Sequence, residues 1–149
     1  MRSLFLIGFL LVVVLLIEWN NKKLSTDAKR DGNQKFKTCC ARQKNADKSC
    51  RRRFCDFDAL SQDNILLFLN ACNFKGNTVA DMWDCATSKT DHLQCCKEKN
   101  VVKECLPYCT HRSVPRDYFK HLFCLQSFNP IRDCFRGYLE ENPNIFGDA

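Results

Sequence analysis

Residues 95–109 read CCKEKNVVKECLPYC, which places four cysteines within fifteen positions, two of them adjacent. A disulfide between adjacent cysteines closes a strained ring, whose Cα separation falls short of the usual value of about 5.5 Å. Cys95 and Cys96 are therefore expected to bridge separate partners and to tie one helix to two others. Cys105 and Cys109 are four residues apart, so on an α-helix they share a face and can each reach a different element. We expect this stretch to join three or more helices.

The other cysteines show that the pattern occurs twice. From Cys39 to Cys85 the spacing is CC-x9-C-x4-C-x16-C-x12-C, and from Cys95 to Cys134 it is CC-x8-C-x3-C-x14-C-x9-C. Because the gap lengths follow the same order, we predict two similar half-modules packed together as one domain. The halves differ at Cys50 and Cys55, whose five-residue spacing does not keep both on one helical face.

The cysteine count and the N-terminus together predict an extracellular protein. The 12 cysteines form an even set without any CxxC, and the three histidines have no ligand spacing, which argues against a zinc site. An apolar run of 14 residues from Leu4 to Ile17 is typical of a signal peptide over residues 1–19 and short for a bilayer span of about 20. We expect secretion, six disulfides, no metal and no cofactor. The cysteines expected to pair, in an order left open, are Cys39, Cys40, Cys50, Cys55, Cys72, Cys85, Cys95, Cys96, Cys105, Cys109, Cys124 and Cys134.

Two alternatives concern the region before the first cysteine. No small-x-small triplet follows Ile17 at the usual distance, so an uncleaved signal anchor with the domain outside the cell is the alternative to cleavage. Membrane contact is expected only in that case. Residues 20–35 are polar and are interpreted as a linker, or as a pro-segment if the dibasic pair Lys29–Arg30 is processed. The folded module is predicted over residues 36–149.

Helical periodicity dominates the segments between the cysteines. Asn129–Pro130 resembles a helix start, Asn142–Pro143 a helix end, and an apolar stripe lies between them. The stripe consists of Ile131, Cys134, Phe135, Tyr138 and Leu139. Two further helices are expected after Asp58 and after a capping box at Thr78 and Asp81. Another is expected to start near Pro115, with helical spacing of Phe119, Leu122, Phe123 and Gln126. Alternating strand patterns are absent, so the predicted fold is a small, all-α, disulfide-rich domain.

The ordered set of twelve cysteines resembles the DB module, a twelve-cysteine domain of secreted and cell-surface proteins found mainly in nematodes. The CCKEKNVVKECLPYC block and the closing C-x9-C segment carry most of this resemblance, which covers about residues 36–146. The resemblance implies six disulfides and an extracellular location. It implies no established biochemical activity and therefore no catalytic residues.

An enzyme is not expected from the residues present. Secreted phospholipases A2 are also small, helical and rich in disulfides, but their CC-x-x-H-D motif is replaced here by Lys97, Glu98, Lys99 and Asn100 after the cysteine pair. Without that histidine and aspartate no group activates a water molecule. The sequence Asp91–His92 is interpreted as an exposed helix-start feature.

Two hypotheses remain for binding. Residues 35–53 carry eight basic residues against one acid, and Arg51, Arg52, Arg53 and Lys48 are the candidate site for an extracellular protein or a sulfated glycan. The alternative for this run is an ordinary solvated face. Nucleic acid is not an expected partner of an exported protein. The second function considered is an extracellular carrier of a small apolar ligand lined by Phe119, Phe123, Phe128 and Phe135, for which a plain hydrophobic core is the alternative.

Overall fold

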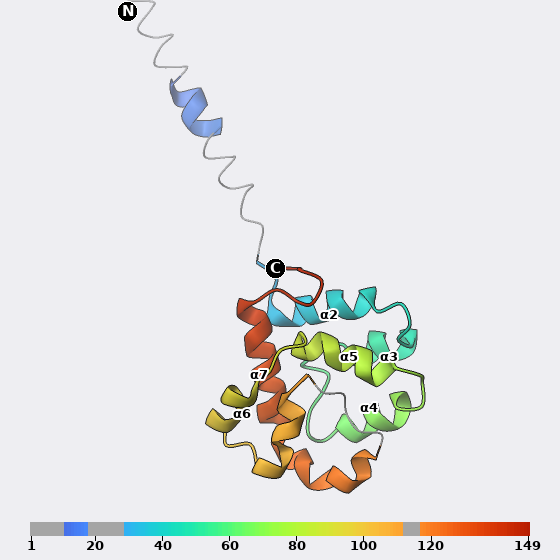
Figure 1. Cartoon of the computed structure of the whole chain (residues 1–149). Coiled ribbons are helices and arrows are strands. Elements are labelled where there is room, and N and C mark those ends of the chain that lie inside the picture. Colours follow the sequence, from blue (N-terminus) through green and yellow to red (C-terminus); the bar gives the residue numbers. More distant parts are fainter. Residues whose placement is uncertain (1–10, 18–28, 112–116) are drawn as a thin grey trace, which may run out of the picture.

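The computed structural model describes residues 11–17, 29–111 and 117–149, and every regular element within these ranges is a helix (Figure 1). The prediction of a small, all-α, disulfide-rich domain is therefore confirmed. The elements after residue 29 are α2 (Gly32–Arg42), α3 (Lys48–Phe54), α4 (Ile65–Cys72), α5 (Thr78–Thr87), α6 (Leu93–Glu98), η1 (Lys103–Cys109), η2 (Tyr118–Ser127) and α7 (Phe128–Glu141). Residues 11–17 are also helical, and no helix in the described ranges has the length and apolarity that a membrane span needs.

The folded domain begins earlier than residue 36. Asp31 caps α2 through a reciprocal pair of hydrogen bonds, in which its carboxylate accepts from the Gln34 amide at 2.7 Å and the Gln34 side chain accepts from the Asp31 amide. Lys35 is buried, and its ammonium donates to the carbonyl of Asn142. The predicted linker over residues 20–35 is thus wrong at its C-terminal end, because a polar helix start was mistaken for a linker. Residues 18–28, which include most of that segment, lie outside the described ranges.

All twelve cysteines form disulfides, and each half closes on itself. In the first half the bridges are Cys39–Cys85, Cys40–Cys55 and Cys50–Cys72. In the second half they are Cys95–Cys134, Cys96–Cys109 and Cys105–Cys124. Both halves use the same order: first with sixth, second with fourth, and third with fifth. No bridge crosses between the halves, since all six are accounted for.

The prediction that residues 95–109 join several helices is confirmed. Cys95 ties α6 to α7, Cys96 ties α6 to η1, and Cys105 ties η1 to η2. The expected α-helix around Cys105 and Cys109 is instead the 3₁₀-helix η1. Pro107 lies within it and is incompatible with a continuous α-helix, because its ring would collide with the carbonyl four residues earlier. With three residues per turn, the two cysteines diverge but still reach separate partners.

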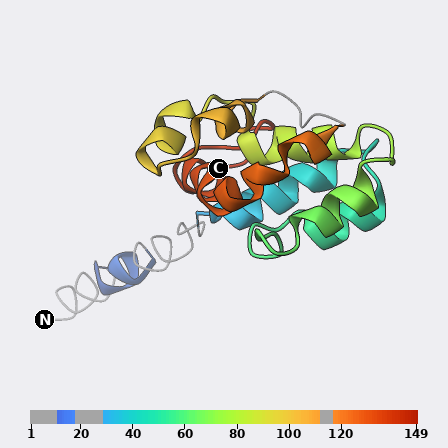
Figure 2. The same cartoon turned by 90° about the horizontal axis from the view of Figure 1, so that it is seen from below.

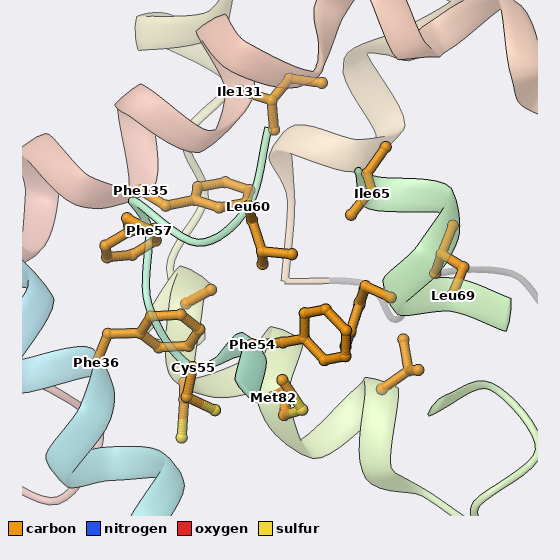
Figure 3. Close-up of a cluster of buried hydrophobic side chains, with 14 of the residues drawn as sticks. Phe36, Phe54, Cys55, Phe57, Leu60, Ile65, Leu69, Met82, Ile131 and Phe135 are labelled. Atoms are coloured by element: carbon orange, nitrogen blue, oxygen red, sulfur yellow. The ribbon is translucent and has the colours of Figure 1, made fainter. Parts of the chain in front are cut away.

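The two halves meet through packed side chains. The helices α2 and α5 lie side by side, and α7 from the second half contacts both (Figure 1). In the buried cluster, Phe36 of α2 stacks on Phe57, and Phe135 of α7 lies close to both (Figure 3). Four members of the predicted α7 stripe are buried: Ile131, Cys134, Phe135 and Leu139. Tyr138 is half-buried, so the predicted stripe is confirmed.

The start of α7 differs from the prediction, whereas its end does not. The helix begins at Phe128, and the Asn129 carboxamide accepts a hydrogen bond from the backbone amide of Gln62 in the other half. Asn129 therefore links the halves and does not cap the helix. The helix ends at Glu141, with Asn142 as its C-cap, as predicted from Asn142–Pro143.

Three other predicted helix starts also differ. Asp58 caps no helix and forms an ion pair with Arg136 of α7, while α4 begins only at Ile65. The Thr78 hydroxyl accepts from the Asp47 amide at 2.8 Å, so it ties α5 to the start of α3 and makes no capping box. The helix expected near Pro115 is the 3₁₀-helix η2, and its predicted start falls in residues 112–116, outside the described ranges.

The close contact of α2 with α7 at Gly32 generates a prediction about this residue. A Cβ atom at this position would lie 2.8 Å from the backbone carbonyl oxygen of Arg136, whereas a Cβ atom at Gly137 would meet nothing within 4 Å. We expect Gly32→Ala to force α2 away from α7 and to lower the free energy of unfolding by about 1–3 kcal/mol. The control Gly137→Ala should raise it by up to about 1 kcal/mol, because alanine favours the helix. Thermal unfolding followed by circular dichroism measures both changes, and equal melting temperatures for the two variants would contradict this packing.

Candidate functional site

The basic run predicted over residues 35–53 is divided by the fold into structural and exposed residues. Lys35 is buried, Lys37 forms an ion pair with Asp56 at 2.6 Å, and Arg42 forms one with Asp148 at 2.8 Å. Lys37 and Arg42 are nevertheless exposed, as are four basic residues that form no ion pair with an acid in the described part of the chain: Lys44, Lys48, Arg52 and Arg53. The other four basic residues of the run, Arg51 included, make hydrogen bonds or ion pairs within the domain.

Arg51, one of the candidate binding residues, is a structural residue. Its guanidinium donates to the backbone carbonyls of Cys40 and Ala41 at 3.1 and 3.0 Å, and to that of Ala46 at 3.1 Å. Two of these carbonyls belong to the last turn of α2, where helical carbonyls lack partners within the helix. Arg51 therefore fastens α3 to the end of α2, and its side chain is not available to a ligand in the way that was predicted.

The structure brings Arg52, Arg53 and Lys48 together on the surface. They border a surface hollow of about 580 Å³ together with Asp47 and Ser49. Within the part of the chain that the structure describes, no acidic group forms an ion pair with any of these three cations. The guanidinium of Arg53 lies 5.1 Å from the centre of the Phe54 ring, which restrains its position.

One acid, Asp47, also borders the hollow, but its charge is compensated. Its carboxylate accepts hydrogen bonds from the Ser49 hydroxyl and from the Cys50 amide, and it forms an ion pair with Lys75 at 3.1 Å. These bonds hold the pKa of Asp47 well below its ordinary value. Asp47 thus remains ionised, and its charge is balanced by Lys75 from the loop between α4 and α5. The hollow therefore keeps a net positive charge.

The backbone beneath the hollow is fixed on both sides. Cys50 ties α3 to Cys72 of α4, and Cys55, directly after the helix, is bridged to Cys40 of α2. Together with the hydrogen bonds of Arg51, these bridges set the orientation of α3. A ligand therefore meets cations in fixed relative positions, which lowers the entropic cost of binding.

The four phenylalanines proposed to line an apolar site do not line one space. Phe119 and Phe123 on η2 are 61% and 49% exposed, while Phe135 is buried in the core and Phe128 is half-buried. The prediction failed because η2 is a 3₁₀-helix, on which residues three apart, and not four apart, share a face. Phe128 and Phe135 do border an apolar cavity, but most of its other walls come from α2, α4, α5 and the segment between α3 and α4.

Asp91 and His92 form a helix start, but His92 is not exposed. The Asp91 carboxylate accepts from the Leu93 amide at 2.7 Å, and His92 directly precedes α6. The His92 side chain is buried against Phe135 and Tyr138 of α7, and its Nε2 lies 2.8 Å from the Thr87 carbonyl oxygen. The sequence correctly predicts that Asp91 and His92 start a helix. The burial of the His92 ring depends on the packing of α7, which the local sequence does not show.

Comparison with protein-family models gives one finding, a match of residues 39–135 to the DB module. The matched range contains every cysteine of the chain. No curated protein and no solved structure matches the chain.

The burial of His92 predicts a dependence of stability on pH. Burial disfavours the imidazolium and lowers the pKa of His92 below its ordinary value of about 6.5, against the opposing effects of the Thr87 carbonyl and Asp91. Below the unfolded-state pKa the unfolded chain binds a proton that the folded domain excludes, so stability falls as the pH is lowered through 6.5. Asp56 does not contribute in this range: its burial opposes ionisation, but hydrogen bonds from Lys37 and Asn33 lower its pKa to about 2.

We expect the melting temperature to fall between pH 7.5 and pH 5.5, and this fall should be smaller in His92→Gln. His111→Gln is the matched control, because His111 is exposed. If the two variants and the parent protein lose the same number of degrees over this pH range, His92 is not the group responsible.

Proposed function

Because the chain belongs to the DB module family, whose disulfide-rich domains are of an extracellular type, we propose that it is a secreted, non-enzymatic binding module that holds a sulfated glycan on α3. The observation that carries this proposal is the hollow bordered by Lys48, Arg52 and Arg53, whose charges have no acidic partner in the described part of the chain.

The chemistry of these cations favours a sulfated ligand. Two guanidinium groups on neighbouring residues offer planar pairs of N–H donors that match the oxygens of a sulfate. A stable protein partner generally needs an interface of about 800 Å² on each side with an apolar centre. The exposed side chains of α3 are charged or polar, so they fit a polyanion better than such an interface. An acidic extracellular protein is the alternative that the experiment below also tests.

Secretion is supported by the apolar run from Leu4 to Ile17 and by the six disulfides, which form and persist in oxidising compartments. We further propose that the halves are two copies of one six-cysteine unit. The shared pairing order, together with the shared order of gaps, supports this interpretation.

A non-enzymatic role is supported by the state of the reactive side chains. All twelve thiols are consumed in disulfides, so no cysteine is available as a nucleophile. The imidazole of His92 is enclosed by the aromatic rings of α7 and is engaged with a backbone carbonyl, so it faces no solvent from which a substrate would approach.

Retention on immobilised heparin in a sodium chloride gradient tests the proposal. In the variant Lys48→Gln/Arg52→Gln/Arg53→Gln, three contacts to the polyanion are lost, and binding should weaken roughly tenfold or more near physiological salt. Arg51 is left intact because it supports the fold. The variant should therefore elute at clearly lower salt than the parent protein.

The matched control changes the same amount of charge elsewhere, in Lys97→Gln/Lys99→Gln/Lys103→Gln, at exposed positions of the second half. It should elute close to the parent protein. If both variants elute at equally reduced salt, only the net charge of the protein matters. If the first variant elutes with the parent protein, the hollow on α3 does not bind a sulfated glycan. Binding of the parent protein to an acidic protein, and not to heparin, would favour the alternative partner.

A further inference from the structure

Two partly open apolar cavities lie between the half-modules, where α4 and α5 face η2 and α7. The larger has a volume of about 70 Å³ and is bordered by Leu66, Leu69, Trp83, Leu122, Leu125 and Phe128, among others. The smaller, of about 40 Å³, lies toward α2 and shares Trp83 and Phe128 with the larger one. Ile65 and Ile131 also border both cavities, and Figure 3 shows them among the core side chains.

We propose that these cavities form a binding site for a small amphiphile, with its apolar tail between the halves and one hydrogen-bonding group at the rim. Most of the wall is formed by aliphatic and aromatic side chains, which offer no hydrogen bonds to a water molecule. An apolar cavity of about 150 Å³, larger than either of these, remains dry and takes up a benzene-sized molecule. The site differs from the one proposed by sequence analysis, because Phe119 and Phe123 do not line it.

The rim of the larger cavity supplies the polar group of the site. Of the polar side chains around it, the Trp83 indole donates to the Thr110 carbonyl and the Tyr118 hydroxyl donates to Asn70 at 2.6 Å. The remaining two are Tyr108 and His121, whose rings lie edge to face with centroids 5.7 Å apart.

Neither Tyr108 nor His121 forms a side-chain hydrogen bond with another described residue; both are half-buried, and their polar atoms reach solvent at the rim. They can therefore bind the head of a ligand, such as a hydroxyl or a carboxylate, while its tail occupies the apolar space. Few other polar groups border the cavity, so a second polar group on the ligand would be buried without a partner, at a substantial cost.

The ligand enters through the wall formed by η2. It is a 3₁₀-helix, whose hydrogen bonds have poorer geometry than those of an α-helix, and its backbone departs from helical angles at His121. Leu122 borders the cavity and is 42% exposed, so it lies between the interior and solvent. The bridge Cys105–Cys124 holds η2 to η1, which allows η2 to shift without leaving the domain.

The two volumes, about 70 and 40 Å³, are together smaller than a cavity of about 150 Å³ that takes up benzene, so they limit the ligand to about seven non-hydrogen atoms. This inference is independent of the glycan proposal, because no residue of the hollow on α3 borders either cavity.

Fluorescence of Trp83 tests the proposal directly, since its indole borders both cavities. The only other tryptophan is Trp19, so the full chain with Trp19→Phe, exported from cells, has a single reporter. Titration with 1-hexanol should change the Trp83 emission and saturate. Titration with 1,6-hexanediol, which carries a hydroxyl at both ends, should require at least about fivefold more ligand. No saturable change with 1-hexanol, or an equal response to both compounds, would overturn the proposal.

Two neighbouring residues locate the site. Leu66 borders the larger cavity, whereas Leu67 is 48% exposed and does not. Leu66→Phe should fill part of the space and weaken 1-hexanol binding roughly tenfold, while Leu67→Phe should leave it unchanged. Undiminished binding in Leu66→Phe would show that the alcohol binds elsewhere.

The polar rim is tested by Tyr108→Phe, which removes the hydroxyl and keeps the ring. We expect 1-hexanol to bind about fivefold more weakly, the effect of losing one hydrogen bond. An unchanged affinity would show that the Tyr108 hydroxyl does not bind the alcohol. The comparison of alcohol and diol uses unaltered cavity walls, so it decides the proposal even if a wall variant fails to fold.

Discussion

The whole fold depends on one covalent constraint: two adjacent cysteines cannot form a disulfide with each other without strain. Each pair is consequently a branch point at which one helix is tied to two elements. Cys39 and Cys40 tie α2 to α5 and to the residue that ends α3, and the second pair ties α6 to α7 and η1. Because the third bridge of each half joins the remaining elements, every helix from α2 to α7 is fixed to at least one other by sulfur. Short helices, which are marginal alone, are stable in such a frame.

The bridges fix each half but not the relation between the halves, which depends on packing and hydrogen bonds. Gly32 allows α2 to approach α7, and the Arg132 guanidinium of α7 donates to the Leu60 carbonyl of the first half. The Trp83 indole reaches the Thr110 carbonyl across the same boundary. The first half carries a rigid basic surface, held by Arg51 and two bridges, while the boundary itself contains unfilled apolar space. The covalent frame and the non-covalent boundary therefore provide different kinds of site. Figure 2 shows α7 of the second half lying beside α2 of the first half.

The sequence predicts those features that depend on local spacing. The even set of cysteines predicts the disulfide class, and the stripe on α7 predicts its buried face, because both follow from periodicity. Features that depend on a distant partner are not predictable in this way. Asn129 and Thr78 resemble helix caps, but their side chains bind backbone amides of other segments. The sequence RRR gives three equivalent arginines, and only the fold separates Arg51 from its neighbours. A signal was nevertheless present: Arg51 lies between Cys50 and Phe54, next to the buried face of a short helix.

The central claim is that two separately closed disulfide frames form one domain. Peptide mapping of the purified protein without reduction tests it most directly. The account predicts six linked pairs, three confined to residues 39–85 and three to residues 95–134, with the same pairing order in each range. A linked peptide that joins the two ranges, or a free thiol in freshly purified protein, would contradict this pairing.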